Sequence, residues 1–233
     1  MELILTEKTT NLETLDNQNN EITLEDVPIY KMEDTGEELV TLEDTIRADE
    51  RRIAKKYSIS IPNIFELALL YADVKQRGKC ISQKYRFNKM LFYVGKKLDE
   101  EYGEKVLIFD GMNIAENGPI TTNLKEDMKK LQQEEIFDIF LVKKGKKIPG
   151  SKKDWDTQKW VSIECILTNK GEDLAQKIWS ELDPEMREII IEVKEKLYYM
   201  KTGKLKKKVH REYPEYRKVY TQEDKETFAY LLK

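Results

Sequence analysis

The sequence predicts a mainly α-helical α+β protein. Several segments carry apolar residues at spacings of three and four, which is typical of helices that bury one face. Two β-rich segments follow the best-marked of these helices, with a lysine-rich stretch between them. The composition, with 39% hydrophobic and 36% charged residues, allows a core but requires a densely charged surface.

Residues 1–57 are expected to form an acidic N-terminal arm. Residues 1–50 contain 15 acidic and 3 basic residues, a net charge of −12, whereas the rest of the chain has a net charge of +9. Two stretches, Glu2–Thr6 and Glu21–Tyr30, are compatible with short strands or with no fixed structure. Because residues 1–40 show little periodicity, we expect the arm to be partly disordered and to end in a helix.

Three helices are predicted between Thr41 and Gly103. Thr41–Tyr57 has a thin apolar stripe among charged residues. Asn63 and Glu66, just after Pro62, resemble a capping box and predict that an apolar helix begins there. Ser82 is a candidate N-cap for the next apolar helix.

A short strand over Val106–Phe109 is expected to lead to the helix on which the rest of the fold depends, Gly118–Phe137. Gly-Pro at the start breaks the preceding element. Thr121, Thr122 and Asn123 are good N-cap residues, which favours a helix start at this point. One face of this helix is apolar and the other carries lysines, so the helix is expected to be half buried.

The next segments complete a recognisable pattern. Ile136–Val142 and Trp160–Leu167 are predicted strands, and Lys143–Lys159 is predicted to be a long, exposed hairpin loop. A helix followed by a strand, a basic loop and a strand is the second half of a winged helix-turn-helix. We therefore predict a winged-helix domain over residues 58–182, with a two- or three-stranded sheet.

Residues 183–233 are expected to form a helical C-terminal extension. Asp183-Pro184 favours a helix start by N-cap and N1 preference. The seam that includes Ile190 and Leu197 is long enough for a partner helix and predicts a homodimer, although it could instead pack on Leu174 and Ile178 of the same chain. A basic stretch and a last short helix from Thr221 follow.

Catalysis has little support in the sequence. The single histidine, His210, lies in a lysine run, where a solvated side chain is expected rather than a general base. The chain contains neither a P-loop nor a Gly-x-Gly-x-x-Gly motif. Cys80 and Cys165 lie in apolar surroundings and are expected to be buried, reduced thiols. We predict no enzyme activity, no cofactor and no metal site.

The sequence also predicts where the protein resides. No run of 18 or more apolar residues exists, and the N-terminus lacks the basic and apolar regions of a secretory signal. A cytoplasmic protein without a membrane contact is expected.

The lysine-rich loop has a mechanism for binding double-stranded DNA, because lysines neutralise phosphates and release counterions. Lysines position such a protein but carry little sequence information, so base readout would fall to the helix that precedes the first strand. The candidate DNA-binding residues are Thr121, Thr122, Asn123, Lys125 and Lys129 of the helix, and Lys143, Lys144, Lys146, Lys147, Lys152 and Lys153 of the wing.

Two resemblances support this interpretation. A strand, Leu167-Thr168-Asn169-Lys170-Gly171 and a helix resemble the Leu-Thr-x-Lys-Gly passage that closes the wing in MarR- and PadR-like regulators. Gly118-Pro119, followed by the spacing of Leu124, Asp127, Leu131 and Ile136, is similar to the Panacea (SocA-like antitoxin) domain. The first resemblance implies DNA-binding transcription regulation, and the second implies toxin neutralisation or protein binding on a winged-helix scaffold.

Two functions thus stay open at this level. The first is a non-enzymatic DNA-binding protein, a winged-helix transcription regulator. The alternative is a protein-interaction module, such as an antitoxin or an adaptor of the transcription or replication machinery. The acidic arm belongs to neither family pattern; it could repel phosphates, cover the basic body or bind a protein partner.

Overall fold

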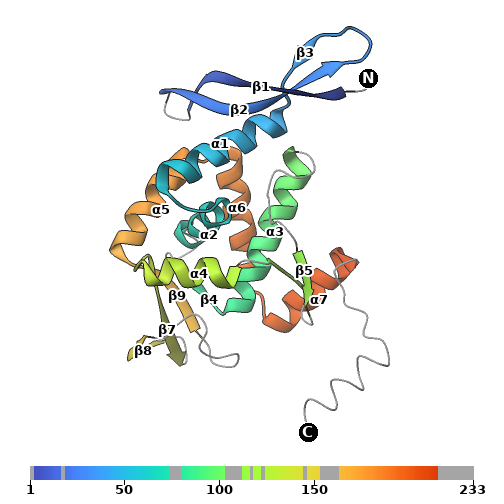
Figure 1. Ribbon diagram of the computed structural model, residues 1–233. Helices are drawn as coiled ribbons and strands as arrows, with labels where there is room; N and C mark the ends of the chain where they lie inside the picture. Colours follow the sequence, from blue (N-terminus) through green and yellow to red (C-terminus); the bar gives the residue numbers. More distant parts are fainter. Residues whose placement is uncertain are drawn as a thin grey trace.

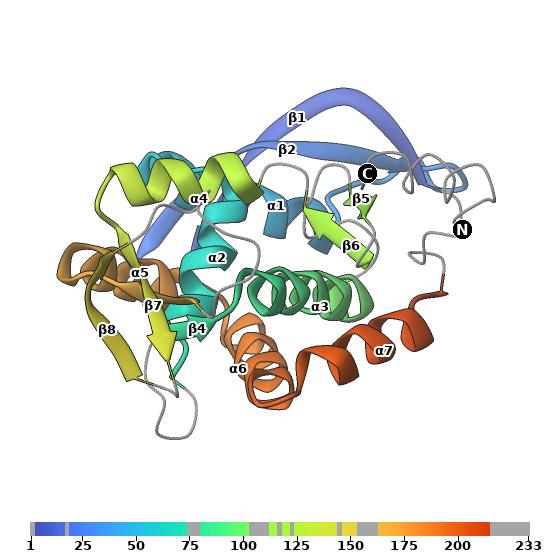
Figure 2. The same ribbon diagram turned by 90° about the horizontal axis from the view of Figure 1, so that it is seen from below.

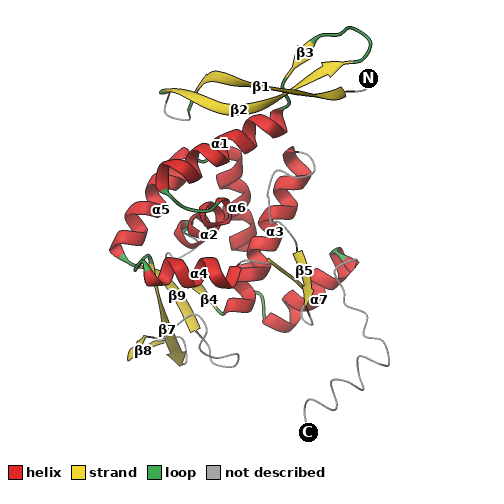
Figure 3. Cartoon of the chain, viewed as in Figure 1, coloured by secondary structure: helices red, strands yellow, loops and turns green. Residues whose placement is uncertain are grey.

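The computed structural model describes residues 3–16, 19–73, 80–102, 112–115, 118–121, 124–143, 146–152 and 163–214. These residues form an α+β fold with seven helices and three small antiparallel sheets (Figures 1 and 3). The mainly helical α+β class predicted from the sequence is confirmed. Among the described helices, none has both the length and the apolar character needed to cross a bilayer. The predicted strand over 106–109 and the predicted last helix from Thr221 lie outside the described residues.

The N-terminal residues form a sheet, where the sequence left open short strands or no fixed structure. Strand β1 (Leu3–Leu15) pairs with β2 (Glu21–Met32), and β2 pairs with the short β3 (Glu38–Leu39). The sheet lies over helix α1 (Leu42–Tyr57) at the top of the molecule in Figure 1. The helix begins as predicted, with Thr41 as the N-cap residue.

A small apolar cluster attaches this sheet to α1. Leu24 and Val27 of β2 are buried together with Ala48 of α1, apart from the main core. Leu24 and Val27 lie three positions apart but are both buried, because the register shifts between them and Asp26 has a left-handed φ of 56°. The bulge interrupts the period-two alternation of buried and exposed residues by which a half-buried strand is identified. The sheet could therefore not be predicted from the sequence pattern.

The main core is built around α2 (Ile61–Tyr71), whose residues from Asn63 to Leu70 are all buried. The N-cap is Ser60 rather than Asn63. The Ser60 Oγ accepts from the Asn63 amide at 3.4 Å, and the Asn63 side chain accepts from the Ser60 amide at 3.3 Å. Asn63 also donates to the carboxyl group of Glu66 at 2.7 Å. The helix was thus predicted at the right place with its capping residues shifted by one turn.

Four strands form the central sheet, in the order β4-β9-β7-β8. The helix α3 (Lys84–Tyr102) follows the first of them and packs on the core. The predicted hairpin loop is partly a strand, because residues 146–152 pair with β7. The bounds are β4 Cys80–Ser82, β7 Phe137–Lys143, β8 Lys146–Lys152 and β9 Ile163–Leu167.

The stretch Gly118–Phe137, in which a helix was predicted to start at the candidate caps Thr121, Thr122 and Asn123, also contains a strand in the structure. The first four residues form β6 (Gly118–Thr121), which pairs with β5 (Met112–Ala115) in a separate hairpin. The helix itself is α4 (Leu124–Gln133). Pro119 lies within β6 because a proline is tolerated in an edge position of a two-stranded ribbon. The candidate caps Thr122 and Asn123 lie outside the described residues.

The Leu-Thr-x-Lys-Gly passage joins the start of α5 (Asn169–Glu181) to the turn that follows α4. Thr168 caps α5 by accepting from the Gly171 amide at 3.1 Å, and its hydroxyl donates to the Glu135 carbonyl at 2.6 Å. Lys170 donates to the Glu134 carbonyl at 2.8 Å. Gly171 is buried against Ile136. This passage therefore fixes the position of α4 and β7 relative to α5.

The apolar seam of α6 (Pro184–Tyr198) lies inside the chain. Asp183 caps this helix as predicted, accepting from the Glu185 amide at 2.8 Å. Ile190 and Leu197 are 0% and 1% exposed, and α6 packs mainly on α3. The seam is therefore not the dimer interface that the sequence favoured, and a homodimer would need another surface. Helix α7 (Thr202–Glu212) follows and closes the described chain.

Both cysteines are free and buried, as predicted. Cys80 of β4 lies 3.3 Å from a carboxylate oxygen of Glu164 and 3.4 Å from the Tyr198 hydroxyl. Burial raises the pKa of the Cys80 thiol. A buried thiol with a raised pKa is unreactive, which favours a structural role for this residue.

Helix α1 is joined to the main core through the carboxylate of Glu181 at the end of α5. This carboxylate is 6% exposed and accepts from Arg52 at 2.7 Å, from Lys56 at 2.5 Å and from the Tyr57 hydroxyl at 2.6 Å. All three donors come from the last part of α1. The cluster therefore connects the element that carries the N-terminal sheet to the rest of the protein.

Candidate nucleic-acid interface

The elements predicted to contact DNA lie at the end of the molecule opposite the N-terminal sheet. In Figure 1 the β7–β8 hairpin lies at the bottom left, α4 lies above it, and α7 lies at the bottom right. Seen from below in Figure 2, α4 and the hairpin occupy one side and α7 the other, with α3 and α6 between them. The acidic N-terminal sheet thus does not cover the described part of the hairpin.

Helix α4 presents a polar face outward. Met128 and Leu131 are 0% and 1% exposed and fix the helix against the core. Lys129 and Lys130 are exposed, as predicted for Lys129. The predicted site residues Thr121 and Lys125 lie in β6 and α4, in positions given by the backbone, whereas Thr122 and Asn123 lie outside the described residues.

The β7–β8 hairpin brings several of the predicted wing lysines together. Lys143 pairs with Lys146 in the register, and Val142 pairs with Lys147, so three lysine positions lie at the end of the hairpin. Lys144 and Lys153 lie outside the described residues. The positions of Lys143, Lys146 and Lys147 agree with a basic hairpin tip.

Lys152 is bound within the hairpin. Its ammonium group lies 2.5 Å from a carboxylate oxygen of Asp138 in β7. The hydrogen bond to Asp138 raises the pKa of Lys152. A phosphate would have to compete with this carboxylate, so Lys152 is a weaker candidate than the sequence indicated.

Helix α7 carries a basic surface, where the sequence predicted only a basic stretch of chain. Leu205 and Val209 are both 0% exposed and hold one face of the helix on the core. The spacing of four between these two apolar residues is the signal that could have identified a helix with an outward basic face. Its exposed cationic residues are Lys201, Lys204, Lys207 and Arg211.

Carboxylates limit how basic this end of the molecule is. Glu126 and Glu134 are exposed on or just after α4, beside the lysines of the same helix. On α7, Glu212 accepts from Lys208 and lies 3.2 Å from Arg211. The positive charge is therefore concentrated at the hairpin tip and on the outer face of α7.

Two findings bear on the function of this surface. The described residues hold no group of three or more His, Cys, Asp and Glu side chains arranged to bind a metal ion. Compared with known proteins, the chain matches no protein-family model, no curated protein and no solved structure. A function is therefore inferred from the geometry of this chain alone.

Proposed function

We propose that this protein is a non-enzymatic, winged-helix DNA-binding protein that acts as a transcription regulator. The observation that carries the proposal is the order of elements, α2-β4-α3-α4-β7-β9, together with the strand order β4-β9-β7. A winged helix-turn-helix has this succession of helices and strands, with its first strand paired to its last. The β5–β6 hairpin before α4 and the strand β8 are additions to that pattern.

In this arrangement α4 has the place of the recognition helix, and the β7–β8 hairpin has the place of the wing. A recognition helix enters the major groove with its N-terminal residues near base edges, which would assign Lys125 and Lys129 to DNA contacts. The lysines of the hairpin tip would neutralise phosphates on the adjacent backbone. The exposed lysines of α7 extend the positive surface, which favours a long contact along the duplex.

The wing is tested by replacing Lys143, Lys144, Lys146 and Lys147 with alanine. Affinity for random duplex DNA is expected to fall, and the slope of log affinity against log salt should shrink by up to about 0.9 for each phosphate that is no longer neutralised. The measurement is a fluorescence-anisotropy titration at several salt concentrations. A charge-matched control replaces four exposed lysines elsewhere, Lys8, Lys31, Lys177 and Lys196. Equal salt slopes for the two variants would contradict a phosphate-binding wing.

Helix α4 is tested separately from the wing. Loss of a base contact lowers the affinity for a particular DNA sequence, whereas loss of a phosphate contact lowers the affinity for all sequences. Lys125→Ala with Lys129→Ala is expected to cost about 1–3 kcal/mol for each base interaction removed, on a duplex selected from a random library. Binding to unselected duplex should change much less. Equal decreases on both duplexes would show that α4 contacts only the backbone, and the protein would then be an architectural DNA binder rather than a regulator.

A protein-interaction module, such as an antitoxin or adaptor, is the second candidate. It is favoured by the mixed charge of α4, because Glu126 and Glu134 would face the phosphates that its lysines bind. A protein partner tolerates this alternation of charge, whereas a polyanion does not. Retention on heparin that depends weakly on salt would support the module and count against DNA binding.

A further inference from the structure

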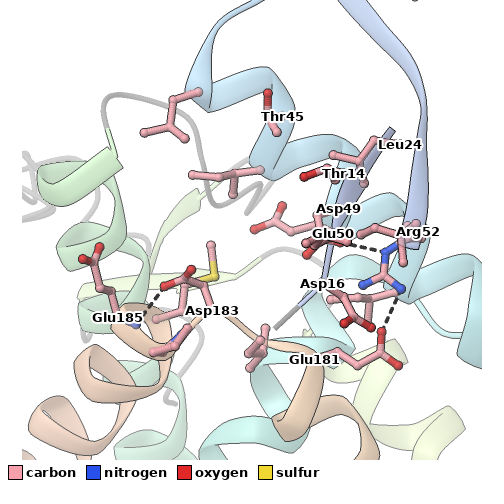
Figure 4. Close-up of a pocket in the computed structure, with 18 of the residues that line it drawn as sticks. Thr14, Asp16, Leu24, Thr45, Asp49, Glu50, Arg52, Glu181, Asp183 and Glu185 are labelled. Carbon is pink, nitrogen blue, oxygen red and sulfur yellow. Dashed lines mark hydrogen bonds and ion pairs between the residues drawn. The ribbon is translucent and has the colours of Figure 1, made fainter. Parts of the chain in front are cut away.

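A pocket of about 450 Å³ lies between the N-terminal sheet, α1 and the junction of α5 with α6 (Figure 4). Its size is in the range of small-molecule sites. One part of the wall is aliphatic, and includes Leu24 of β2, Ile53 of α1 and Met186 of α6. The pocket lies at the end of the molecule opposite the lysine hairpin, so it is independent of the proposed DNA contacts.

The polar part of the wall is strongly acidic. Among the described residues that line the pocket are six carboxyl groups and one guanidinium, a formal charge of −5. Arg52 is already engaged, because it donates to Asp49 and Glu181 at 2.7 Å each. The carboxyl residues are Asp16, Asp49, Glu50, Glu181, Asp183 and Glu185.

Glu50 differs from the other buried acids of the described chain. Its side chain is 2% exposed, and both carboxyl oxygens are buried without a hydrogen-bond partner. The comparably buried Glu66 accepts from Asn63, and Glu181 accepts from three donors. A buried carboxyl group without a donor is costly, so among the acids of this pocket Glu50 is the one that a donor from a ligand would stabilise most.

We propose that this pocket binds a linear aliphatic diamine or polyamine. One ammonium group would donate to the carboxylate of Glu50, and the methylene chain would lie against the aliphatic wall. A second ammonium group would lie near Asp183 and Glu185, which Figure 4 shows on the α6 side of the pocket, away from Glu50 on α1. Aliphatic walls with acids at both ends fit this class of ligand better than a compact metal ion, which needs several oxygen ligands at one point.

The protonation of Glu50 offers a second observable. Burial raises the pKa of Glu50 to about 8, so the empty pocket holds the neutral acid at pH 7. An ammonium group at hydrogen-bond distance favours the carboxylate, so binding should release a proton near neutral pH. Among the described residues, Arg47, Asp49 and Arg51 of α1 act on the charge of Glu50. The other charged or titratable groups that line the same pocket are Arg52 of α1, Asp16 after β1, Tyr102 of α3, Glu181 of α5, and Asp183 and Glu185 at the start of α6.

The test is isothermal titration of the full chain with 1,5-diaminopentane and with spermidine, in two buffers of different ionisation enthalpy. We expect saturable binding of one ligand per chain with release of a proton. Glu50→Gln should weaken binding at least about tenfold. The control Glu195→Gln makes the same substitution at an exposed position of α6 and should bind as the unchanged chain does. The absence of saturable binding, or equal affinities for the Glu50 and Glu195 variants, would overturn the proposal.

Two further measurements keep the test decisive. Glu185→Gln should weaken binding of 1,5-diaminopentane but not of 1-aminopentane, so it tests the second ammonium site even if the Glu50 variant does not fold. The tripeptide Ala-Lys-Ala presents the same ammonium on a peptide. If it binds more tightly than the free amines, the pocket is a lysine-binding site for a protein and the proposal of a small amine falls. Alanine variants of the wing lysines should bind amines normally, so failure here and failure of the proposed DNA binding are distinguishable.

Discussion

Gly171→Ala is expected to destabilise the protein by about 3 kcal/mol or more, the upper range for an overpacked core position. A Cβ atom at this position would lie 1.8 Å from the Ile136 carbonyl oxygen and 2.7 Å from its carbonyl carbon. Both are backbone atoms, so a side-chain rotation cannot relieve the overlap. The first turn of α5 would have to move away from the turn that joins α4 to β7, which would also weaken the hydrogen bonds of Thr168 and Lys170 to that turn.

A matched control is available on α7. Gly203 also lies in the first turn of a helix, but a Cβ atom there would meet no atom within 4 Å. Gly203→Ala should be neutral or raise the free energy of unfolding by up to about 1 kcal/mol, because alanine loses less backbone entropy in a helix. Urea denaturation followed by circular dichroism measures both variants. If the two substitutions changed the free energy of unfolding equally, the close packing of α5 on the Ile136 carbonyl group would be contradicted.

Glu181→Ala is expected to lower the free energy of unfolding by about 3 kcal/mol, within the range for removing one partner of a buried ion pair. The variant leaves the guanidinium of Arg52, which is 16% exposed, without one of its two carboxylate partners. It also removes the acceptor of the Tyr57 hydroxyl and of Lys56. Since all three donors belong to α1, the attachment of the N-terminal sheet to the main core should weaken most.

The pH dependence of this effect has a definite sign. Burial opposes ionisation of Glu181, but the hydrogen bonds from Lys56, Tyr57 and Arg52 outweigh it and lower its pKa from the ordinary value of 4.5. A carboxyl group with a lowered pKa stabilises the folded state fully above pH 4.5, and this contribution is lost as the pH falls through the folded-state pKa. The difference between the unchanged chain and Glu181→Ala should therefore shrink on acidification. Asp173→Ala, at an exposed position of α5, should show neither the destabilisation nor its pH dependence.

The helical part of the fold could be predicted because its signals are local. The apolar spacing over Thr41–Tyr57 and the Asp183-Pro184 start both correspond to helices in the structure. The N-terminal sheet could not be predicted, because its pairing joins residues that are distant in the sequence and the bulge at Asp26 interrupts the alternation of buried and exposed residues. The α6 seam was misjudged for a related reason. Its apolar length was visible, but the sequence does not show that α3 covers it.

The candidate interface was predicted in composition but not in geometry. The sequence located the lysines of the wing, and the register of β7 and β8 then decides which of them share the hairpin tip. The pairing of Lys152 with Asp138 depends on that register and has no signal of its own. In the sequence, Glu50 cannot be distinguished from the other charged residues of an amphipathic helix. It is buried where α1 meets the N-terminal sheet and the junction of α5 with α6, an arrangement of distant segments that has no local signal.

The separation of charge described above makes the molecule an electric dipole. Its negative pole is the N-terminal sheet, and its positive pole is the end that carries the lysine hairpin and α7 (Figure 1). The field of a polyanion exerts a torque on such a molecule before any atoms touch, within about a Debye length of the surface. The lysine end is turned toward the polyanion and the acidic end is turned away. In the DNA binding proposed above, the chain would therefore arrive already oriented, and a larger fraction of its collisions would bring the lysine end into contact with DNA.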